Sequence, residues 1–400
     1  MIHSLTDIYL ETLRRVDPAV RIAQRWAGEP HRGPVIVLGK CARRMAEGLA
    51  RAGWSGRGIA VVPRGYEGEG DWPSGLEVHL GSHPMMDGAS FNAGSSLFAF
   101  ASTLESPALV LISGGSSACV EWPVDGVTAE DLAEINHHLV RAGIPIDRIN
   151  AVRKHLSSIK GGRLARLLPQ GSRSWIWSDV PPGRADLVGS GPMSADPSSL
   201  EDAAAILDGI DSGTARELAR KLRSGAIPET PSAMDAEPEL LADNRTLLEA
   251  AVAVARERRI DARVDFTQLD DDVETVAARI VFEIERLEPG TLAIRGGEPT
   301  VIVRGEGRGG RCSEVALRVL RLAEERGLAS FEVLVGSSDG IDGNSGAAGY
   351  LVRGGSGLRG KIDQALDASD AHSLASEAGE AIVTGATGNN LRDIIVMARG

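Results

Sequence analysis

Two cations stand at the starts of predicted helices, each directly after a glycine turn. Lys40 follows the apolar run 35–38 and Gly39, and Arg311 follows the glycine-rich stretch 305–310. The helix macrodipole puts partial positive charge at a helix N-terminus, so a cation there is unfavourable unless an anion lies beside it. Backbone N–H groups and the cation could then bind one phosphate or carboxylate group. The alternative at both positions is a solvated surface charge.

The same glycines allow a second interpretation. Gly305, Gly307 and Gly310 match the G-x-G-x-x-G spacing of dinucleotide-binding folds. Such a site also needs an acid about 20 residues further on, at the end of the next strand. Position 330 is serine and Asp339 lies well beyond it. A nicotinamide-dependent hydroxypyruvate reductase is therefore the lesser of the two functional hypotheses.

Carboxylates also stand where strands are expected to end. Asp179 follows the apolar run 175–177, and an acid at the carboxyl end of a strand can hold Mg²⁺ or accept a hydroxyl proton. Asp339, Asp342 and Glu298 lie in glycine turns. Aspartate beside glycine is a turn former by default, and we adopt that interpretation for Asp342.

Two further glycine turns, 113–117 and 384–390, carry hydroxyl and amide side chains after apolar runs. Each could cradle phosphate groups or be an ordinary strand-to-helix turn. Arg153, Lys154 and Lys160 lie close together on a segment that is predicted to be largely helical. They form either a solvated basic face or a cationic wall for an acidic substrate.

The elements that must position these residues follow a recurring pattern of apolar run, glycine turn and helix. We predict strands at 35–38, 109–112, 300–303, 331–335 and 381–383, and long helices at 128–142 and 238–258. The stretch 198–287 shows no confident strand. Alternating strands and helices favour an α/β fold with parallel sheets, in which ligands bind beyond the carboxyl ends of the strands.

Length and composition restrict the class of protein. Four hundred residues exceed the roughly 250–300 that one hydrophobic core supports, so we expect two domains, 1–287 and 288–400, with the border at Glu288-Pro289-Gly290. A net charge of −12 disfavours nucleic acid as a partner. Residues 1–27 alternate charged and apolar residues at helical spacing, and no apolar stretch reaches membrane-spanning length. Cys41, Cys119 and Cys312 are too scattered for a disulfide framework or a zinc site, so we expect a cytoplasmic protein.

A series of short motifs occurs in a fixed order between residues 17 and 394. They are Gly39-Lys40, Ser82-His-Pro-Met-Met-Asp87, Leu111-Ile-Ser-Gly-Gly115, Asn150-Ala-Val-Arg-Lys-His-Leu-Ser157, Lys160-Gly-Gly162, Ser178-Asp-Val180, Ser190-Gly-Pro192, Gly296-Gly-Glu298, Gly309-Gly-Arg311, Asp339-Gly-Ile-Asp-Gly343 and Thr384-Gly-Ala-Thr-Gly388. Together they resemble the class II glycerate 2-kinase family, whose C-terminal part is called the MOFRL domain. The resemblance covers nearly the whole chain.

The resemblance implies two α/β domains, a Rossmann-like N-terminal domain and a MOFRL-type C-terminal domain with a mixed sheet, and an active site in the cleft between them. It also implies Mg²⁺-dependent transfer from ATP to the 2-hydroxyl of D-glycerate or a closely related small hydroxy acid. The presumed catalytic lysine and arginine of the family match Lys40 and Arg311.

The sequence departs from the family pattern in several polar loops. Pro182-Gly183 stands where the family has Gly-Asp, Cys312-Ser313 replaces Asn-Gln, and Asn344, Ser345 and Gly346 replace Pro-Thr and an acid. If Gly183, Cys312 and Ser313 face the acceptor, its pocket is widened and D-glycerate is no longer strongly preferred. A third hypothesis is a family member that binds ligand without turnover.

We therefore expect Lys40 and Arg311 to neutralise charge, Asp179 to serve as base or metal ligand, and Asp339 to be a second ligand of Mg²⁺. The predicted substrate-binding or nucleotide-binding residues are Ser113, Gly114, Gly115, Ser116, Arg153, Lys154, Lys160, Glu298, Gly309, Gly310, Thr384, Gly385, Thr387, Gly388 and Asn389. The expected partners are ATP and a small hydroxy acid, with neither nucleic acid nor membrane, and a homodimer is the candidate assembly.

Overall fold

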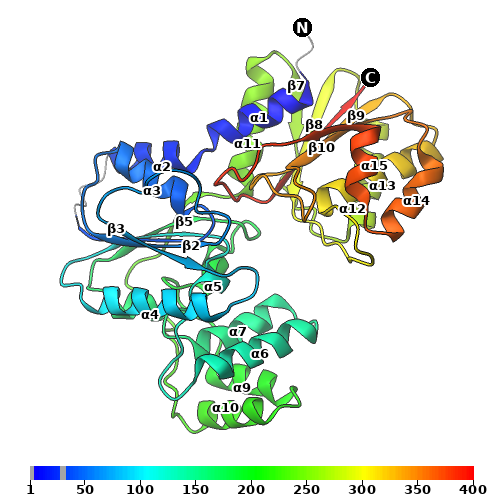
Figure 1. The fold of residues 1–400 in the computed structure, drawn as a ribbon. Helices are drawn as coiled ribbons and strands as arrows, with labels where there is room; N and C mark the ends of the chain where they lie inside the picture. The colour runs from blue at the N-terminus through cyan, green and yellow to red at the C-terminus, as the bar shows by residue number, and fades with distance from the viewer. Residues whose placement is uncertain (1–3, 28–32) are drawn as a thin grey trace. The chain divides into compact units, whose positions relative to one another are not determined.

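Two six-stranded sheets organise the chain in the computed structural model, which describes residues 4–27 and 33–400 (Figure 1). Each sheet belongs to its own unit. The first-sheet unit comprises Arg21–Leu241, and the second-sheet unit comprises Ala242–Gly400 together with the segment that ends at Val20. An α/β architecture with a parallel and a mixed sheet confirms the predicted fold class.

The first sheet has the strand order β3-β2-β1-β4-β5-β6. Its strands are β1 Val35–Leu38, β2 Gly58–Pro63, β3 Leu76–Gly81, β4 Leu109–Ser113, β5 Arg173–Trp177 and β6 Glu239–Ala242. The pairs β3–β2, β2–β1, β1–β4 and β4–β5 are parallel. β1 and β4 are buried along their whole length, as expected for parallel strands that helices cover on both faces. Both strands confirm the predictions.

Helices cover both faces of this sheet, with α3 on one side and α4 on the other (Figure 1). The helices are α2 Pro18–Ala27, α3 Ala42–Arg51, α4 Gly88–Ser102, α5 Ser116–Cys119, α6 Ala129–Arg141, α7 Ile146–Leu156, α8 Arg163–Leu167, α9 Leu200–Asp208 and α10 Gly213–Arg223, with a 3-10 segment η1 at Ala185–Ser190. The sheet order reverses between β1 and β4, because the chain adds β2 and β3 on one side and β4 to β6 on the other. Such a switch point opens a crevice at the carboxyl ends of the strands.

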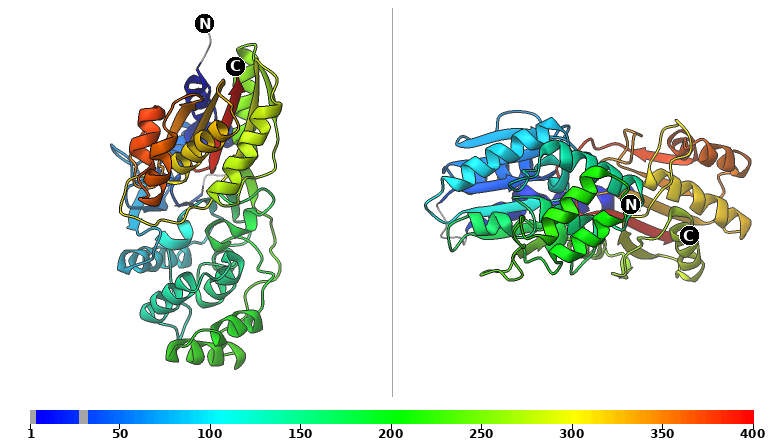
Figure 2. Two further views of the ribbon diagram at one scale, coloured as in Figure 1. Left: turned by 90° about the vertical axis from the view of Figure 1, so that its right-hand side faces the viewer. Right: turned by 90° about the horizontal axis from the view of Figure 1, so that it is seen from below.

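Four helices of this unit, α6, α7, α9 and α10, lie together (Figure 2). One apolar core cluster contains residues from all four, together with Met86 and Phe91. α6 begins where the sequence predicts. Its N-cap Thr128 accepts a hydrogen bond from the backbone N–H of Asp131 at 3.0 Å, and the Asp131 carboxylate accepts one from the N–H of Thr128 at 2.9 Å. The two reciprocal bonds form a capping box at the start of the predicted helix.

The second sheet has the order β11-β10-β9-β12-β8-β7. Its strands are β7 Asp261–Val264, β8 Thr291–Gly297, β9 Phe331–Ser337, β10 Gly349–Arg353, β11 Gly379–Ile382 and β12 Asp393–Arg399. β7 and β8 are parallel, and the other described pairs are antiparallel. The helices are α1 Leu5–Arg15, α11 Asn244–Glu257, α12 Val273–Arg286, α13 Arg311–Glu325, α14 Arg359–Asp367 and α15 Ala371–Ala378.

α1 packs in the second-sheet unit against α11 and β9. Its Tyr9 hydroxyl donates to the carbonyl oxygen of Ser337 at 2.6 Å. The predicted helical character of residues 1–27 is therefore confirmed for α1 and α2, while residues 1–3 lie outside the described residues. This contact therefore places an N-terminal helix in the same unit as the C-terminal part of the chain.

Three predicted elements differ in the structure. Residues 301–304 form coil, and Ile302 and Val303 are 77% and 72% exposed, so this apolar run has no sheet to join. The segment 238–258 contains a strand, β6, before α11, because Asp243 caps the helix through the N–H of Thr246. The stretch 198–287 contains β6 and β7, four-residue strands at the ends of their sheets that give too little alternation to recognise.

The border between the units also differs from the predicted domain border at 287/288. It falls between Leu241 and Ala242. The side-chain amide of Asn244, at the start of α11, donates to the carbonyl oxygens of Leu391 and Asp393 at 2.7 and 3.0 Å. Residues 242–287 therefore complete the second-sheet unit.

The described residues contain no helix long and apolar enough to cross a membrane. The side chains of Cys41, Cys119 and Cys312 are buried and are not joined in disulfides.

Candidate active site

Lys40 and the turn 113–117 lie together at the switch point of the first sheet. The backbone N–H of Lys40 donates to the carbonyl oxygen of Gly114 at 2.8 Å. The Ser113 hydroxyl accepts from the N–H of Cys41 at 3.0 Å and donates to the carbonyl oxygen of Leu38 at 2.9 Å. Because these bonds tie the ends of β1 and β4 to each other, the predicted lysine and the predicted hydroxyl-bearing turn form one site.

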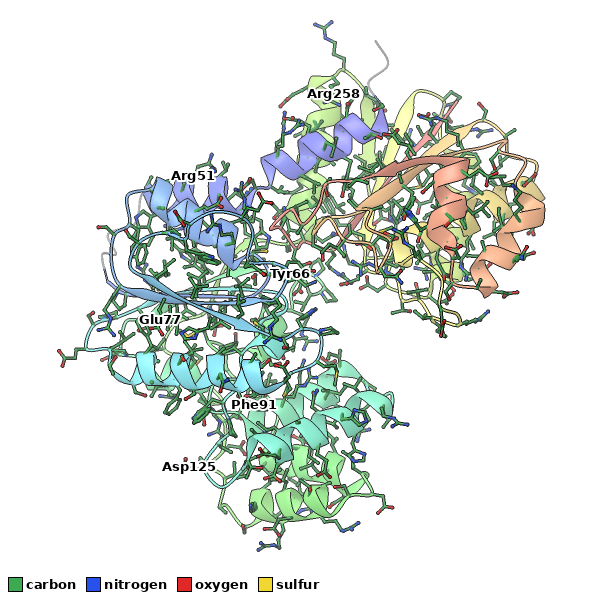
Figure 3. The ribbon with its side chains drawn as sticks, in the orientation of Figure 1. Arg51, Tyr66, Glu77, Phe91, Asp125 and Arg258 are labelled. Atoms are coloured by element: carbon green, nitrogen blue, oxygen red, sulfur yellow. The ribbon has the colours of Figure 1, made fainter. Side chains whose placement is uncertain are left out.

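The side chain of Lys40 crosses Gly115. A Cβ atom on Gly115 would lie 2.9 Å from Cγ of Lys40, and the positive φ of 80° at this position favours glycine as well. The Lys40 ammonium lies 5.1 Å from the ring centroid of Tyr66, on the loop that follows β2 (Figure 3). An aromatic face attracts a cation at this distance. Tyr66 therefore helps to hold the ammonium at the edge of the sheet.

A chain of hydrogen bonds supports the turn from behind. The hydroxyls of Ser117 and Ser190 are 2.7 Å apart, and Ser190 donates to Oδ1 of Asn150 on α7 at 3.0 Å. Ser116 donates to the carbonyl oxygen of Ser113 at 2.8 Å. Ser190 and Asn150 were not among the predicted site residues, although both belong to motifs that carry the family resemblance.

Asp179 lies at the same edge of the first sheet. The register pairs Ser113 with Trp177, so the chain leaves β5 beside the turn that follows β4. Asp179 comes two residues later and is partly exposed. The structure thus brings Lys40, Ser113 and Asp179 to the carboxyl ends of three neighbouring strands. Mg²⁺ is usually held by one or two carboxylates together with substrate phosphates, and a partly exposed carboxylate at this edge fits that need.

Of the predicted basic residues, Lys154 and Lys160 are buried and Arg153 is partly buried. Lys154 is 4% exposed and its ammonium lies 3.2 Å from Oδ1 of Asp196. Lys160 is 1% exposed and donates to the Glu121 carboxylate, and Arg153 donates to Oδ1 of Asn136 at 2.8 Å. Burial lowers the pKa of Lys160, although the neighbouring Glu121 carboxylate acts to raise it. This geometry favours a role in positioning the surrounding loops over contact with substrate.

The second sheet gathers charged residues at one edge. Its register pairs Asp393, the first residue of β12, with Gly297 and with Ser337. Arg311 donates from Nε and Nη2 to the two oxygens of Asp393 at 2.6 and 2.8 Å, and its Nη1 lies 3.3 Å from Glu298. Arg311 and Glu298, which were predicted separately, therefore lie together beside an aspartate that was not predicted.

Burial controls the charge state of Asp393. Its side chain is 1% exposed, and burial raises its pKa to about 6, although the guanidinium of Arg311 acts in the opposite direction. The neighbouring carboxylates of Glu298 and Asp339 raise the pKa further. For Arg311, burial acts to lower the pKa, but Asp393 outweighs it and the net shift is upward. The cation thus stays charged, and the acid is the group that titrates.

The positive end of α13 already has an anion from its own chain. Asp342 accepts hydrogen bonds from the backbone N–H groups of Cys312 and Ser313 at 2.8 and 3.1 Å. Asp342 is therefore more than the turn former that its sequence context indicates. Cys312 and Ser313 are fully buried, so the two substitutions do not face an acceptor.

Backbone N–H groups of the glycine loop 305–310 are bonded to other parts of the protein. Gly307 donates to the carbonyl oxygen of Ala368 at 3.2 Å, Gly309 to Oδ1 of Asn344 at 2.8 Å, and Gly310 to the Ser313 hydroxyl at 2.8 Å. These N–H groups are not presented to a phosphate. Gly309 and Gly310, two of the predicted binding residues, lie in a packed loop that ends beside Arg311 at the edge of the second sheet.

The turn 384–389 packs onto the turn after β9. The N–H of Thr387 donates to the carbonyl oxygen of Asp339 at 3.0 Å. The Thr387 hydroxyl donates to the carbonyl oxygen of Ser338 at 2.6 Å. Asn389 donates from its side chain to the carbonyl oxygen of Val16 at 2.9 Å. Oδ1 of Asp339 accepts from Ser337 and from the N–H of Ile341. These side chains hold the turns together.

The other predicted positions of this turn differ in exposure. Thr384 is partly exposed and donates to the carbonyl oxygen of Gly385 at 2.8 Å, and Gly385 and Gly388 both have positive φ. Asp339 is 5% exposed, so it fits a metal less well than Asp179 does. Within residues 4–27 and 33–400, no group of three or more His, Cys, Asp or Glu side chains could hold a metal ion.

Two charged residues at the edge of the second sheet, Asp393 and Arg392, were not predicted from the sequence. Arg392 has a φ of 66° and is 5% exposed, and it donates to Gln268 and Asp270 at 2.7 and 2.6 Å. Its Nε lies 3.6 Å from Glu298. One sequence signal could have indicated them, an Arg-Asp pair directly before the apolar run 394–397. An antiparallel strand starts at the edge where its neighbours end, so residues that precede it can belong to a site at that edge.

The first sheet has Rossmann order and carries a lysine and a hydroxyl-bearing turn at its switch point, and the second sheet is mixed with a charged edge. These features define a class of two-unit α/β enzymes. Residues 4–223 match the family model described as a domain of unknown function, DUF4147, and residues 291–393 match the MOFRL family. The chain belongs to the glycerate 2-kinase family, which confirms the resemblance seen in its sequence motifs.

Relatives at similar distance carry two different names. D-glycerate 2-kinase of Thermotoga maritima is 30% identical over 90% of this chain and 89% of its own length. A putative hydroxypyruvate reductase of Agrobacterium vitis is 34% identical over 98% of this chain and 92% of its own. The crystal structure of glycerate kinase from Thermotoga maritima superposes with a TM-score of 0.87 at 27% identity, covering 99% of this chain and 98% of that one.

Proposed function

We propose that this protein transfers a phosphoryl group from ATP to the 2-hydroxyl of D-glycerate or a closely related small hydroxy acid. The observation that carries the proposal is the joined site at the switch point of the first sheet, where Lys40 and the turn 113–117 are bonded to each other. This is the place where open α/β sheets bind their ligands. Phosphoryl transfer relies mainly on positioning and on neutralising charge, and a lysine and a hydroxyl-bearing turn supply both.

In this proposal Lys40 neutralises charge on the phosphoryl group that is transferred. The 113–117 turn presents backbone and hydroxyl groups, and the chain Ser117, Ser190 and Asn150 keeps the turn in place. Arg311 neutralises phosphate or carboxylate charge from its own unit, and Asp393 fixes the plane of its guanidinium. Asp393 is thus a positioning residue in this account.

Asp179 has two possible tasks, which the proposal ranks. As a base it would take the proton of the acceptor hydroxyl. As a ligand it would hold Mg²⁺, which in kinases neutralises charge on the β- and γ-phosphates. Because Asp179 is partly exposed at the edge that also carries Lys40, we favour the ligand role for it over Asp339, whose Oδ1 holds its own turn.

The second candidate function is nicotinamide-dependent reduction of hydroxypyruvate, and the observation in its favour is the name of the Agrobacterium vitis relative. The fold gives this function little support. A dinucleotide fingerprint needs a strand before its glycines, and residues 301–304 are coil. In the Rossmann-ordered sheet the corresponding turn follows β1, and it contains Gly39 as its single glycine.

Ligand-induced stabilisation separates these functions. A ligand that binds the native state and not the unfolded state stabilises the protein by RT ln(1 + [L]/Kd), so it raises the melting temperature. We expect ATP with Mg²⁺ to raise the melting temperature and NADH to leave it unchanged. A rise with NADH alone would favour the reductase. A rise with ATP but no turnover of any hydroxy acid would identify a family member that binds ligand without catalysis.

A further inference from the structure

The second-sheet unit contains a hollow of roughly 380 Å³ beside Arg311. Its volume lies in the range of pockets that hold whole small molecules, about 300–1,000 Å³. A three-carbon hydroxy acid would leave most of this space empty. The hollow therefore fits a larger ligand than the proposed acceptor.

One wall of the hollow is apolar. It consists of Pro299, Val301 and Val303, which belong to the coil between β8 and the glycine loop. Val301 packs against the core of the unit, whereas Val303 is 72% exposed. An exposed apolar wall beside a hollow is typical of a ligand site, because ligand pockets are mainly apolar with a few polar groups at defined places.

A second part of the lining is backbone from the glycine loop and the turn after β9. Its N–H groups at Gly307, Gly309 and Gly310 are bonded within the protein, at 3.2, 2.8 and 2.8 Å. This wall therefore offers no cradle of free donors to an anion. The part of the ligand that enters the hollow should be uncharged.

Two charged side chains border the hollow. Glu314, in the first turn of α13, has a side chain that is 4% exposed, and Arg318 donates to its Oε2 at 2.7 Å. A buried carboxylate repels phosphate and accepts hydrogen bonds from amino or hydroxyl groups. Arg311 supplies the positive charge. The hollow can therefore hold an apolar ring that carries polar substituents. Beside it, Arg311 can hold an anionic group.

We propose that this hollow seats the nucleoside of ATP, with the base against the apolar wall and the phosphates toward Arg311. The inference rests on the proposed use of ATP and adds the place at which the nucleotide is recognised. A base presents an uncharged aromatic face to Pro299, Val301 and Val303. Oε1 of Glu314 would accept from an amino or a hydroxyl group of the nucleoside.

The test compares two neighbouring residues of the same coil. Val303 lines the hollow and Ile302 does not belong to its lining, yet both are highly exposed, at 72% and 77%, so neither substitution should unfold the protein. Val303→Asp puts a charge against the base, and Ile302→Asp adds the same charge nearby as the matched control. Titration calorimetry measures binding of ADP and of inorganic tripolyphosphate, which lacks the nucleoside, to both variants and to the wild type.

We expect Val303→Asp to weaken ADP binding by about tenfold or more, which corresponds to about 1.4 kcal/mol. Tripolyphosphate should bind to both variants alike, and Ile302→Asp should bind ADP nearly as the wild type does. In turnover, Val303→Asp should raise KM for ATP and leave KM for the hydroxy acid unchanged. Equal ADP affinity in the two variants would overturn the nucleoside site while the kinase function stands. A wild type that does not bind ADP at all would overturn both.

Discussion

Arg311 and Asp393 form a two-pronged ion pair, with Nε and Nη2 of the arginine 2.6 and 2.8 Å from the two carboxylate oxygens. Asp393 begins a central strand and is 1% exposed, so the sheet fixes the position of its carboxylate. The carboxylate in turn fixes the plane of the guanidinium, whose planar shape suits bidentate contact. Arg311 therefore points in one direction before any ligand arrives.

We expect Asp393→Asn to lower kcat/KM by about a hundredfold, because a small misplacement of a charged group can cost that much. The amide cannot accept both guanidinium bonds, so Arg311 loses its fixed orientation. Asp363→Asn is the matched control, since Asp363 is an exposed partner of Arg321 in the same unit. Similar kcat/KM values in the two variants would refute the positioning role.

The pH dependence of the same variant gives a second readout. Burial raises the pKa of Asp393 to about 6, so its carboxylate gains a proton as the pH falls through about 6 and no longer orients Arg311. We expect kcat/KM of the wild type to fall below that pH and Asp393→Asn to lack this step. The free energy of unfolding changes with pH in the opposite direction to kcat/KM. Between pH 3.8, the ordinary pKa of an aspartate, and about pH 6, the folded state retains the Asp393 proton that the unfolded state has lost. The stability contribution of this group is thus lost as the pH rises through that window.

Arg311→Lys should also fail. An ammonium is a compact charge that cannot make two parallel bonds to Asp393 and keep further donors for phosphate. We expect a loss of turnover comparable to that of Asp393→Asn, measured as kcat with both substrates saturating. Full activity would show that Arg311 is only a structural charge.

Lys40→Met should abolish turnover and leave the protein folded, because the methionine keeps the packing across Gly115 and removes the ammonium. Lys361→Met is the control, since Lys361 is an exposed lysine that pairs with Glu377, and such pairs contribute about 0–1 kcal/mol. Initial rates and melting temperatures should be measured for both. Turnover near the wild-type level in Lys40→Met would exclude the proposed role.

Asp179→Asn removes a negative charge at the edge of the first sheet with little change in shape. If the carboxylate holds Mg²⁺, the variant should need more Mg²⁺ and recover part of its turnover at high Mg²⁺. If it is the base, kcat should stay low at every Mg²⁺ concentration. Unchanged kinetics would reject both roles.

The structure changes what we expect of the acceptor. A widened pocket would require Cys312 and Ser313 to face the substrate, but both are fully buried in α13. Gly183 remains on an exposed turn with open space around it. We therefore expect kcat/KM for D-glycerate to exceed that for four-carbon sugar acids by on the order of a thousandfold, as for a dedicated polar site. Comparable values would mean that the acceptor site is wide for another reason.

Local patterns predicted the parts of the fold in which sequence and structure agree at short range. The runs at β1, β4 and β9 are apolar and buried, and Thr128 and Asp131 form a complete cap, so each could be recognised within a few residues. The run 300–303 is equally apolar but forms no strand, since pairing depends on a partner that the local sequence does not show. Sequence likewise could not reveal that α1 belongs to the second-sheet unit.

The candidate site shows the same limit. Lys40 and Arg311 were found because each follows a glycine turn at the start of a predicted helix, which is a local signal. Asp393 was missed because its importance comes from the register of β12 between β8 and β9. The anion that the macrodipole argument requires at α13 is Asp342, a residue of the chain itself. Local sequence predicts the need for an anion but does not identify it.

The proposed reaction is phosphoryl transfer from ATP to the 2-hydroxyl of a small hydroxy acid. Phosphorus NMR of a reaction with ATP, Mg²⁺ and D-glycerate tests it most directly, because the spectrum identifies both the ADP formed and the carbon that carries the phosphate. We expect ADP and 2-phosphoglycerate in equal amounts, and no product with Lys40→Met. Formation of 3-phosphoglycerate, or oxidation of NADH by hydroxypyruvate with no use of ATP, would contradict it.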